Sequence, residues 1–130
     1  MTRTVLIVGQ DPDTVDFADP ALIPGMTADK VRAGLAQARK LLAEAGLDSE
    51  VCLTDAGETA EATVAAHLSG RTYDCVVIGG GIRLPPSKLL LFEKVLNAVH
   101  RHAPGTPIAF NTSPADSAAA ALRWVKPTAA

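Results

Sequence analysis

Cysteine is scarce in this sequence. The 130 residues include two cysteines, Cys52 and Cys75, whose separation matches neither a zinc-binding motif nor a disulfide framework. Because structural disulfides are rare in reducing compartments, this usage predicts a cytoplasmic protein. Both residues fall within predicted strands, where a thiol acts as a small buried hydrophobe and not as a nucleophile.

Long apolar runs and an excess of one charge are also absent. No apolar run approaches the roughly 18 residues that a membrane-spanning helix requires. The opening MTRTVLIVGQ holds four consecutive apolar residues, too few for a secretory signal. Twelve basic and fourteen acidic side chains give a net charge of −2, with no basic excess for a nucleic-acid backbone or anionic lipid. We therefore expect neither a membrane nor a nucleic acid as a partner.

What the sequence does contain is an alternation of short β-branched runs with longer helical stretches. The predicted strands are residues 5–8, 51–53, 75–78 and 107–110. Parallel strands joined by right-handed helical crossovers form a three-layer sandwich. We therefore predict one flavodoxin-like α/β domain over residues 1–130, with a four-stranded parallel sheet of order 2-1-3-4.

Capping residues predict where the helices begin and end. Thr27 begins the first helix and Gly46 ends it, while Asp55 and Glu58 form a capping-box pattern for the second. Ser87 caps the third helix. A serine–proline pair begins the last helix, which runs through an alanine block to Trp124. The inward stripe predicted for the third helix is Phe92, Leu96 and Val99.

Residues 10–26, QDPDTVDFADPALIPGM, form a long loop after the first strand. Connections of this kind normally take two to six residues, and longer ones often serve as lids or binding loops. We expect a lid over a ligand, and its apolar inner face would consist of Phe17, Leu22, Ile23 and Met26. The aspartates of the loop lack the spacing of a calcium loop and are explained by Asx-turns, so we expect no metal there. These aspartates are Asp11, Asp13, Asp16 and Asp19.

The glycine-rich segment after the third strand is the other notable feature. In an open parallel sheet, ligands bind where the strand order reverses, which here lies between the first and third strands. Gly79, Gly80 and Gly81 can adopt positive φ and admit a ligand close to the backbone, and Arg83 offers a donor fork for carboxylate or phosphate. The alternative is a turn that only lets strand and helix pack closely. Neither a dinucleotide fingerprint nor a Walker loop is present, so we expect no cofactor.

These observations predict a ligand site at the carboxyl edge of the sheet. The histidines end their helices and so lie at the opposite edge, which leaves no general base beside the glycines. An acid–base reaction would depend on Asp11, Asp13 or Asp55, and we assign no catalytic residue. The candidate ligand-binding residues are Gln10, Asp11, Gly79, Gly80, Gly81, Arg83, Ser87, Asn111 and Thr112.

Several short segments resemble a response-regulator receiver domain. They are residues 5–8 with Asp11-Pro12, residues 73–78 with 83–85, residues 106–108, and Lys126-Pro127. The resemblance implies a flavodoxin-like fold, an aspartate phosphorylated after the third strand, and magnesium held by acidic residues after the first. Here glycines stand at the acceptor position, and the acidic pair is reduced to Asp11 beside Gln10. The resemblance therefore implies a pseudo-receiver that is not phosphorylated in the usual way.

Two functions from different classes remain open. The first is binding of a small anionic or phosphate-bearing ligand at the carboxyl edge, with the lid closing over it and an enzymatic reaction left undecided. The alternative is a phosphorylation-incompetent pseudo-receiver or a dimeric interaction module. In that case the small residues Ala118–Ala121 would allow a second copy to approach the last helix closely.

Overall fold

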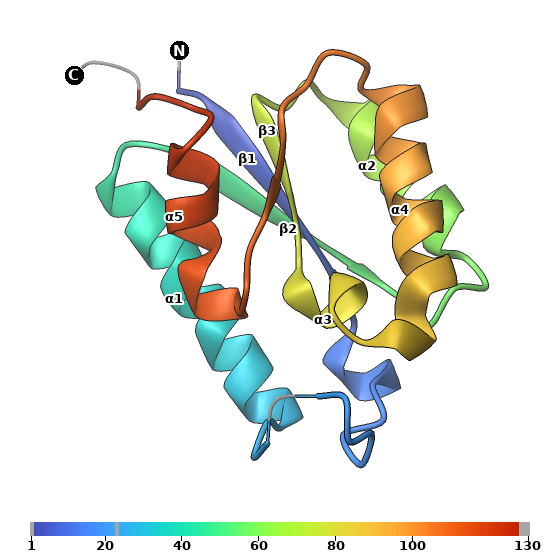
Figure 1. Cartoon of the computed structure of the whole chain (residues 1–130). Coiled ribbons are helices and arrows are strands. Elements are labelled where there is room, and N and C mark those ends of the chain that lie inside the picture. The colour runs from blue at the N-terminus through green and yellow to red at the C-terminus, as the bar shows by residue number, and fades with distance from the viewer. Residues whose placement is uncertain (1, 23, 128–130) are drawn as a thin grey trace.

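The computed structural model describes residues 2–22 and 24–127. Four parallel strands form one sheet of order β2-β1-β3-β4, which confirms the predicted fold class and strand order (Figure 1). The structure is thus an α/β sandwich of flavodoxin-like topology. The strands are β1 (Thr4–Gln10), β2 (Asp48–Thr54), β3 (Cys75–Ile78) and β4 (Ile108–Phe110).

Helices cover both faces of the sheet. The helices α1 (Ala28–Glu44) and α5 (Ser117–Leu122) lie on one face, and α2 (Ala60–Gly70) and α4 (Leu89–His102) lie on the other (Figure 1). A single helical turn, α3 (Gly80–Arg83), follows β3. None of the helices in the described part of the chain is long and apolar enough to cross a membrane.

The central strands bury both of their faces, as their continuous apolar runs predict. Val5 and Ile7 of β1 pack into the core beneath α1 and α5, whereas Leu6 and Val8 pack into the core beneath α2 and α4. This alternation follows from the two-residue period of a strand. The strand β1 continues to Gln10 because its backbone pairs with β2 as far as Thr54. Gln10 is therefore part of the sheet and not the first residue of the loop.

The predicted caps of α1 are confirmed, and the capping box of α2 is wrong. Thr27 Oγ1 accepts a hydrogen bond from the Lys30 amide at 3.2 Å, and Gly46 ends the helix with φ 83°. In contrast, α2 begins at Ala60 after Thr59. The Asp55 carboxylate instead accepts from the amides of Gly57 and Thr59, each at 2.9 Å. Asp55 therefore stabilises an additional turn that precedes the helix.

The third and last helices differ from prediction at their ends. Ser87 lies in a 3₁₀ turn, and α4 begins at Leu89. Val99 is buried as predicted, but Leu91 and Val95 are buried in place of Phe92 and Leu96, which are only partly buried. The helix α5 ends at Leu122, before Trp124. Three residues of the alanine block pack into the core of the same chain, namely Ala118, Ala120 and Ala121.

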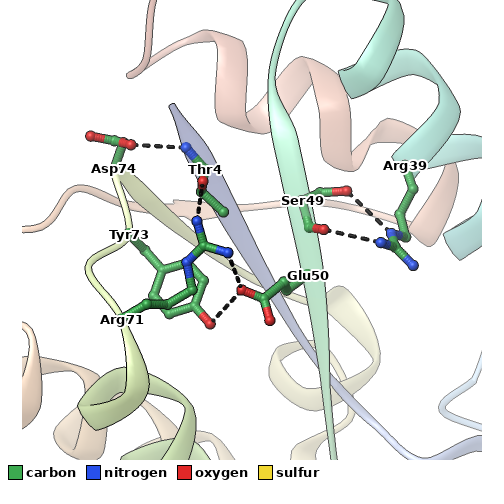
Figure 2. Close-up of polar contacts among 7 residues, drawn as sticks. All are labelled: Thr4, Arg39, Ser49, Glu50, Arg71, Tyr73 and Asp74. Carbon is green, nitrogen blue, oxygen red and sulfur yellow. Dashed lines mark hydrogen bonds and ion pairs between the residues drawn. The ribbon is translucent and has the colours of Figure 1, made fainter. Parts of the chain in front are cut away.

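Polar side chains join three strands at the amino edge of the sheet (Figure 2). The Glu50 carboxylate accepts hydrogen bonds from Arg71 Nη1 at 2.8 Å and from the Tyr73 hydroxyl at 3.0 Å. Arg71 Nη2 also donates to Thr4 Oγ1 at 2.8 Å, and Asp74 Oδ2 accepts from the Thr4 amide at 2.8 Å. This network connects the beginnings of β1, β2 and β3, at the edge opposite the predicted ligand site.

The Tyr73 hydroxyl is expected to ionise only in strong alkali. Burial, with a smaller contribution from Glu50, raises the pKa of Tyr73 to about 12. An exposed tyrosine has a pKa of about 10, so the contribution of Tyr73 to stability is complete below about pH 10. It is lost as the pH rises through about 12.

Absorbance of tyrosinate measures this titration directly, because Tyr73 is the single tyrosine of the chain. We expect a midpoint near 12 in the native protein and near 10 in denaturant. The variant Tyr73→Phe should lack the absorbance change and lose less stability in alkali. A native midpoint equal to that in denaturant would show that the hydroxyl is not buried.

Candidate functional site

A cavity of about 120 Å³ lies at the carboxyl edge of the sheet, on the α1 face. Its walls come from the ends of β1 and β3, the first turns of α1, residues 79–82 of the glycine turn (residues 79–83), and residues 84–85 and 111–114. The lid, which we define as residues 11–26, contributes a further wall. The cavity therefore lies at the switch point between β1 and β3, where the sheet order predicts a ligand.

Two glycines at the ends of the central strands make room for the cavity. Gly9 follows Ile7 on the α1 face of β1, and Gly79 follows Val77 on the same face of β3. Neither residue has a side chain to fill the space below α1. An added Cβ at Gly79 would lie 3.3 Å from the Val8 carbonyl oxygen, so a larger residue does not fit without a backbone shift.

The lid contributes apolar side chains to the cavity, as the sequence predicts. Phe17, Leu22 and Met26 all line it and are half-buried. Ile23, the fourth predicted member of this inner face, lies outside the described residues. Val31 and Leu35 of α1 add to the apolar lining. These two residues are absent from the sequence-based candidates because apolar residues at helical spacing are typical of the buried face of any surface helix.

Two polar contacts connect the lid to α1 and to the turn before α4. Asp13 Oδ1 accepts from Arg32 Nη2 of α1 at 2.7 Å, and Asp19 Oδ2 accepts from Ser87 Oγ at 3.2 Å. The first contact is an exposed ion pair, a class that contributes at most about 1 kcal/mol. The lid is thus held by weak exposed contacts together with its buried apolar face.

Three of the four lid aspartates form the predicted Asx-turns, whereas Asp13 pairs with Arg32. Carboxylate oxygens of Asp11, Asp16 and Asp19 accept hydrogen bonds from backbone amides two residues later, at 2.9–3.0 Å. In the part of the chain that the structure describes, no group of three His, Cys, Asp or Glu side chains could hold a metal ion. The Asp11 side chain lines neither the cavity nor the neighbouring groove.

The glycine turn is helical, and the predicted use of positive φ is wrong. None of Gly79, Gly80 and Gly81 has a positive φ. Glycine is required at the second position for a different reason. An added Cβ at Gly80 would lie 3.0 Å from the Thr112 carbonyl oxygen and 3.2 Å from that of Asn111, whereas Gly81 faces open space. Gly80 therefore lets β3 and the segment after β4 approach each other closely.

Asn111 joins the glycine turn to α5. Its side chain is buried, its Oδ1 accepts from the Gly80 amide at 2.6 Å, and its Nδ2 donates to Ser117 Oγ at 2.8 Å. Both polar ends of the amide are therefore used within the protein. Asn111 lines the cavity but positions its wall instead of presenting a free group to a ligand.

Arg83 does not reach the cavity, although the sequence predicts it as the anion-binding residue. Its Nη2 donates to the Asn111 carbonyl at 3.1 Å, and its guanidinium carbon lies 5.3 Å from the centre of the Phe110 ring. The side chain is therefore directed toward the end of β4 and is absent from the lining of the cavity. Ser87 is also absent from this lining and belongs to the groove beside the cavity.

The other predicted polar residues of the lining are already paired. Gln10 Nε2 donates to the Thr14 carbonyl at 3.1 Å, and its Oε1 accepts from Lys88 Nζ. Thr112 Oγ1 donates to Asp116. No Lys, Arg, His, Asp or Glu side chain lines the cavity among the described residues. The cavity thus offers mainly apolar contacts.

Of the candidate residues, the structure brings Gln10, the three glycines, Asn111 and Thr112 together in the lining of one cavity. The structure leaves Asp11, Arg83 and Ser87 outside its lining. Compared with family models, curated proteins and solved structures, the chain matches none.

Proposed function

We propose that this protein binds a small molecule at the carboxyl edge of its sheet, with an apolar group of the ligand in the cavity. The observation that carries the proposal is the composition of the walls. Apolar side chains of the lid and of α1 line the cavity together with Gly9, the residue before the last of β1, and Gly79, the residue directly after β3. A cavity with few convergent polar groups at a switch point is a common form of ligand site.

The size of the cavity limits the group that it can hold. Its volume of about 120 Å³ is close to that of engineered apolar cavities of roughly 150 Å³, which bind benzene. A single ring or a short branched alkyl group therefore fits. The apolar walls disfavour a charged group at this place, because an unpaired charge would lose part of its hydration without gaining a partner.

The apolar lining therefore limits where an anionic ligand, as expected from the sequence, could place its charge. An anionic or phosphate-bearing ligand would hold its charged group outside the cavity and its apolar group within. The lining also supplies no titratable side chain among the described residues, so the proposal is for binding and assigns no reaction.

Benzene and toluene are suitable probes for this proposal. In NMR titrations of the protein, we expect the largest chemical-shift changes at Val31, Leu35 and the glycine turn. The variant Val31→Phe adds a ring to the cavity wall and should weaken binding at least about tenfold, because the ring competes for the same space. Its matched control, Ala36→Phe, places the ring on the exposed side of the same helix and should bind like the wild type.

Absence of any probe-dependent shift at the lining would refute the proposal. Equal binding by Val31→Phe and the wild type would do the same, because the probe would then occupy another place. Circular dichroism verifies that both variants are folded before the titration.

A further inference from the structure

A second depression adjoins the first at the same edge, on the α4 side. This groove has a volume of about 480 Å³, and we call it the lysine groove. Unlike the cavity, it is lined by charged side chains. Lys88 and Lys94 enter it from the beginning of α4, Asp16 and Asp19 enter it from the lid, and Gln10 and Ser87 lie between them.

The two lysine side chains are half-buried and donate hydrogen bonds to uncharged oxygens. Lys88 Nζ donates to Gln10 Oε1, and Lys94 Nζ donates to the Gly57 carbonyl at 3.2 Å. Among the described residues, neither ammonium forms an ion pair. Burial lowers the pKa of Lys88, and the nearby charges of Asp19 and Asp16 only partly oppose this effect. The groove therefore holds two ammonium groups that lack a direct counter-ion.

The lid aspartates Asp16 and Asp19 lie in the same groove but form no ion pair with either lysine, and three of their four carboxylate oxygens accept hydrogen bonds from other groups. Asp16 Oδ1 accepts from the Ala18 amide at 3.0 Å, and Asp19 Oδ1 accepts from the Ala21 amide at 2.9 Å. The other oxygen of Asp19 accepts from Ser87 Oγ. The carboxylates are thus fixed on the lid side of the groove, and a ligand anion would lie between them and the lysines.

We propose that the lysine groove binds a small oxyanion, the phosphate or carboxylate group of a soluble metabolite, through Lys88 and Lys94. Two ammonium groups on one wall provide charge-assisted hydrogen bonds to such an anion. An anion bound there would replace the water lost by the lysines on burial. The site shares only Gln10 with the cavity, so it does not depend on the proposal for an apolar ligand.

The charge of Asp19 provides a second test of the proposal, because removing it should change the affinity for anions. Because its carboxylate faces the same groove, it repels a bound anion and weakens affinity. The variant Asp19→Asn keeps the shape of the side chain and removes the charge, so it should bind anions more tightly. A structural role of the lysines alone would not produce this increase.

Isothermal titration calorimetry at low ionic strength, with inorganic phosphate and with pyrophosphate, measures the anion affinity of the site. We expect Lys88→Ala and Lys94→Ala to weaken binding about tenfold or more each, and Asp19→Asn to tighten it about threefold. The matched control is Lys40→Ala, which removes an exposed lysine of α1 and should leave affinity unchanged.

Three results would overturn the assignment. They are no binding of either probe by the wild type, an equal loss of affinity in Lys40→Ala, or unchanged affinity in both groove variants. If a lysine variant does not fold, Asp19→Asn decides alone, and an affinity equal to or weaker than that of the wild type would refute the site. Acetate in place of phosphate distinguishes a carboxylate ligand from a phosphate ligand.

Discussion

Replacing Asn111 with alanine is expected to lower the free energy of unfolding by about 2–4 kcal/mol. Asn111 is 3% exposed and joins the Gly80 amide to Ser117 Oγ. Alanine leaves the Gly80 N–H group without an acceptor in a buried place, which alone costs about 1–3 kcal/mol. The remaining loss comes from the space that the amide group vacates.

Urea unfolding followed by circular dichroism measures the loss, and hydrogen exchange at the Gly80 amide identifies its origin. In Asn111→Ala we expect faster exchange at this amide, because its hydrogen bond is absent. The control is Thr112→Ala at the exposed next residue, where the loss should not exceed about 1 kcal/mol. Equal destabilisation by the two variants would contradict the assigned role of Asn111.

The sheet could be predicted because its signals are local and repeated. The runs Val5–Val8 and Cys75–Ile78 are too short and too β-branched for helices, and both are buried on two faces as expected. Helical stretches between the strands then impose parallel crossovers and leave few strand orders to consider. The sheet order therefore followed from the pattern of the chain alone.

Turn geometry was harder to predict because one sequence pattern fits several backbones. Three consecutive glycines allow positive φ, yet here they begin a helical turn, with Gly79 at φ −67°. The reason for Gly80 lies in residues 111–112, whose carbonyl oxygens leave no space for a Cβ. Such a long-range contact leaves no local signal. Asp55 and Glu58 match a capping box, but the Asp55 carboxylate instead accepts from the amides of Gly57 and Thr59, and the helix begins at Ala60.

The site was predicted at the level of segments and less well at the level of side chains. Strand ends, glycines and lid converge because parallel strands all terminate at one edge. The direction of a long side chain depends on packing, and Arg83 packs over Phe110 instead of entering the cavity. Lys88, which directly precedes α4, and Lys94 within α4 were missed because their spacing matches no known anion-binding motif.

Replacing Ile82 with alanine is expected to cost about 2–5 kcal/mol and to enlarge the cavity. Ile82 is fully buried, packs in the core beneath α2 and α4, and also lines the cavity. Its truncation removes apolar contacts in the core, and buried sites collapse only partly to restore such contacts. The vacated volume adds to the cavity, so the variant should accept a larger ring than the wild type does.

A titration with benzene and with indole, together with urea unfolding, tests both effects in one protein. We expect indole to bind the variant Ile82→Ala more tightly than the wild type, while benzene binding changes less. The control Leu89→Ala removes a side chain that is 60% exposed on α4 and should alter stability by at most about 0.5 kcal/mol. A large loss of stability without any change in probe preference would mean that Ile82 supports the core without forming the wall of a ligand site.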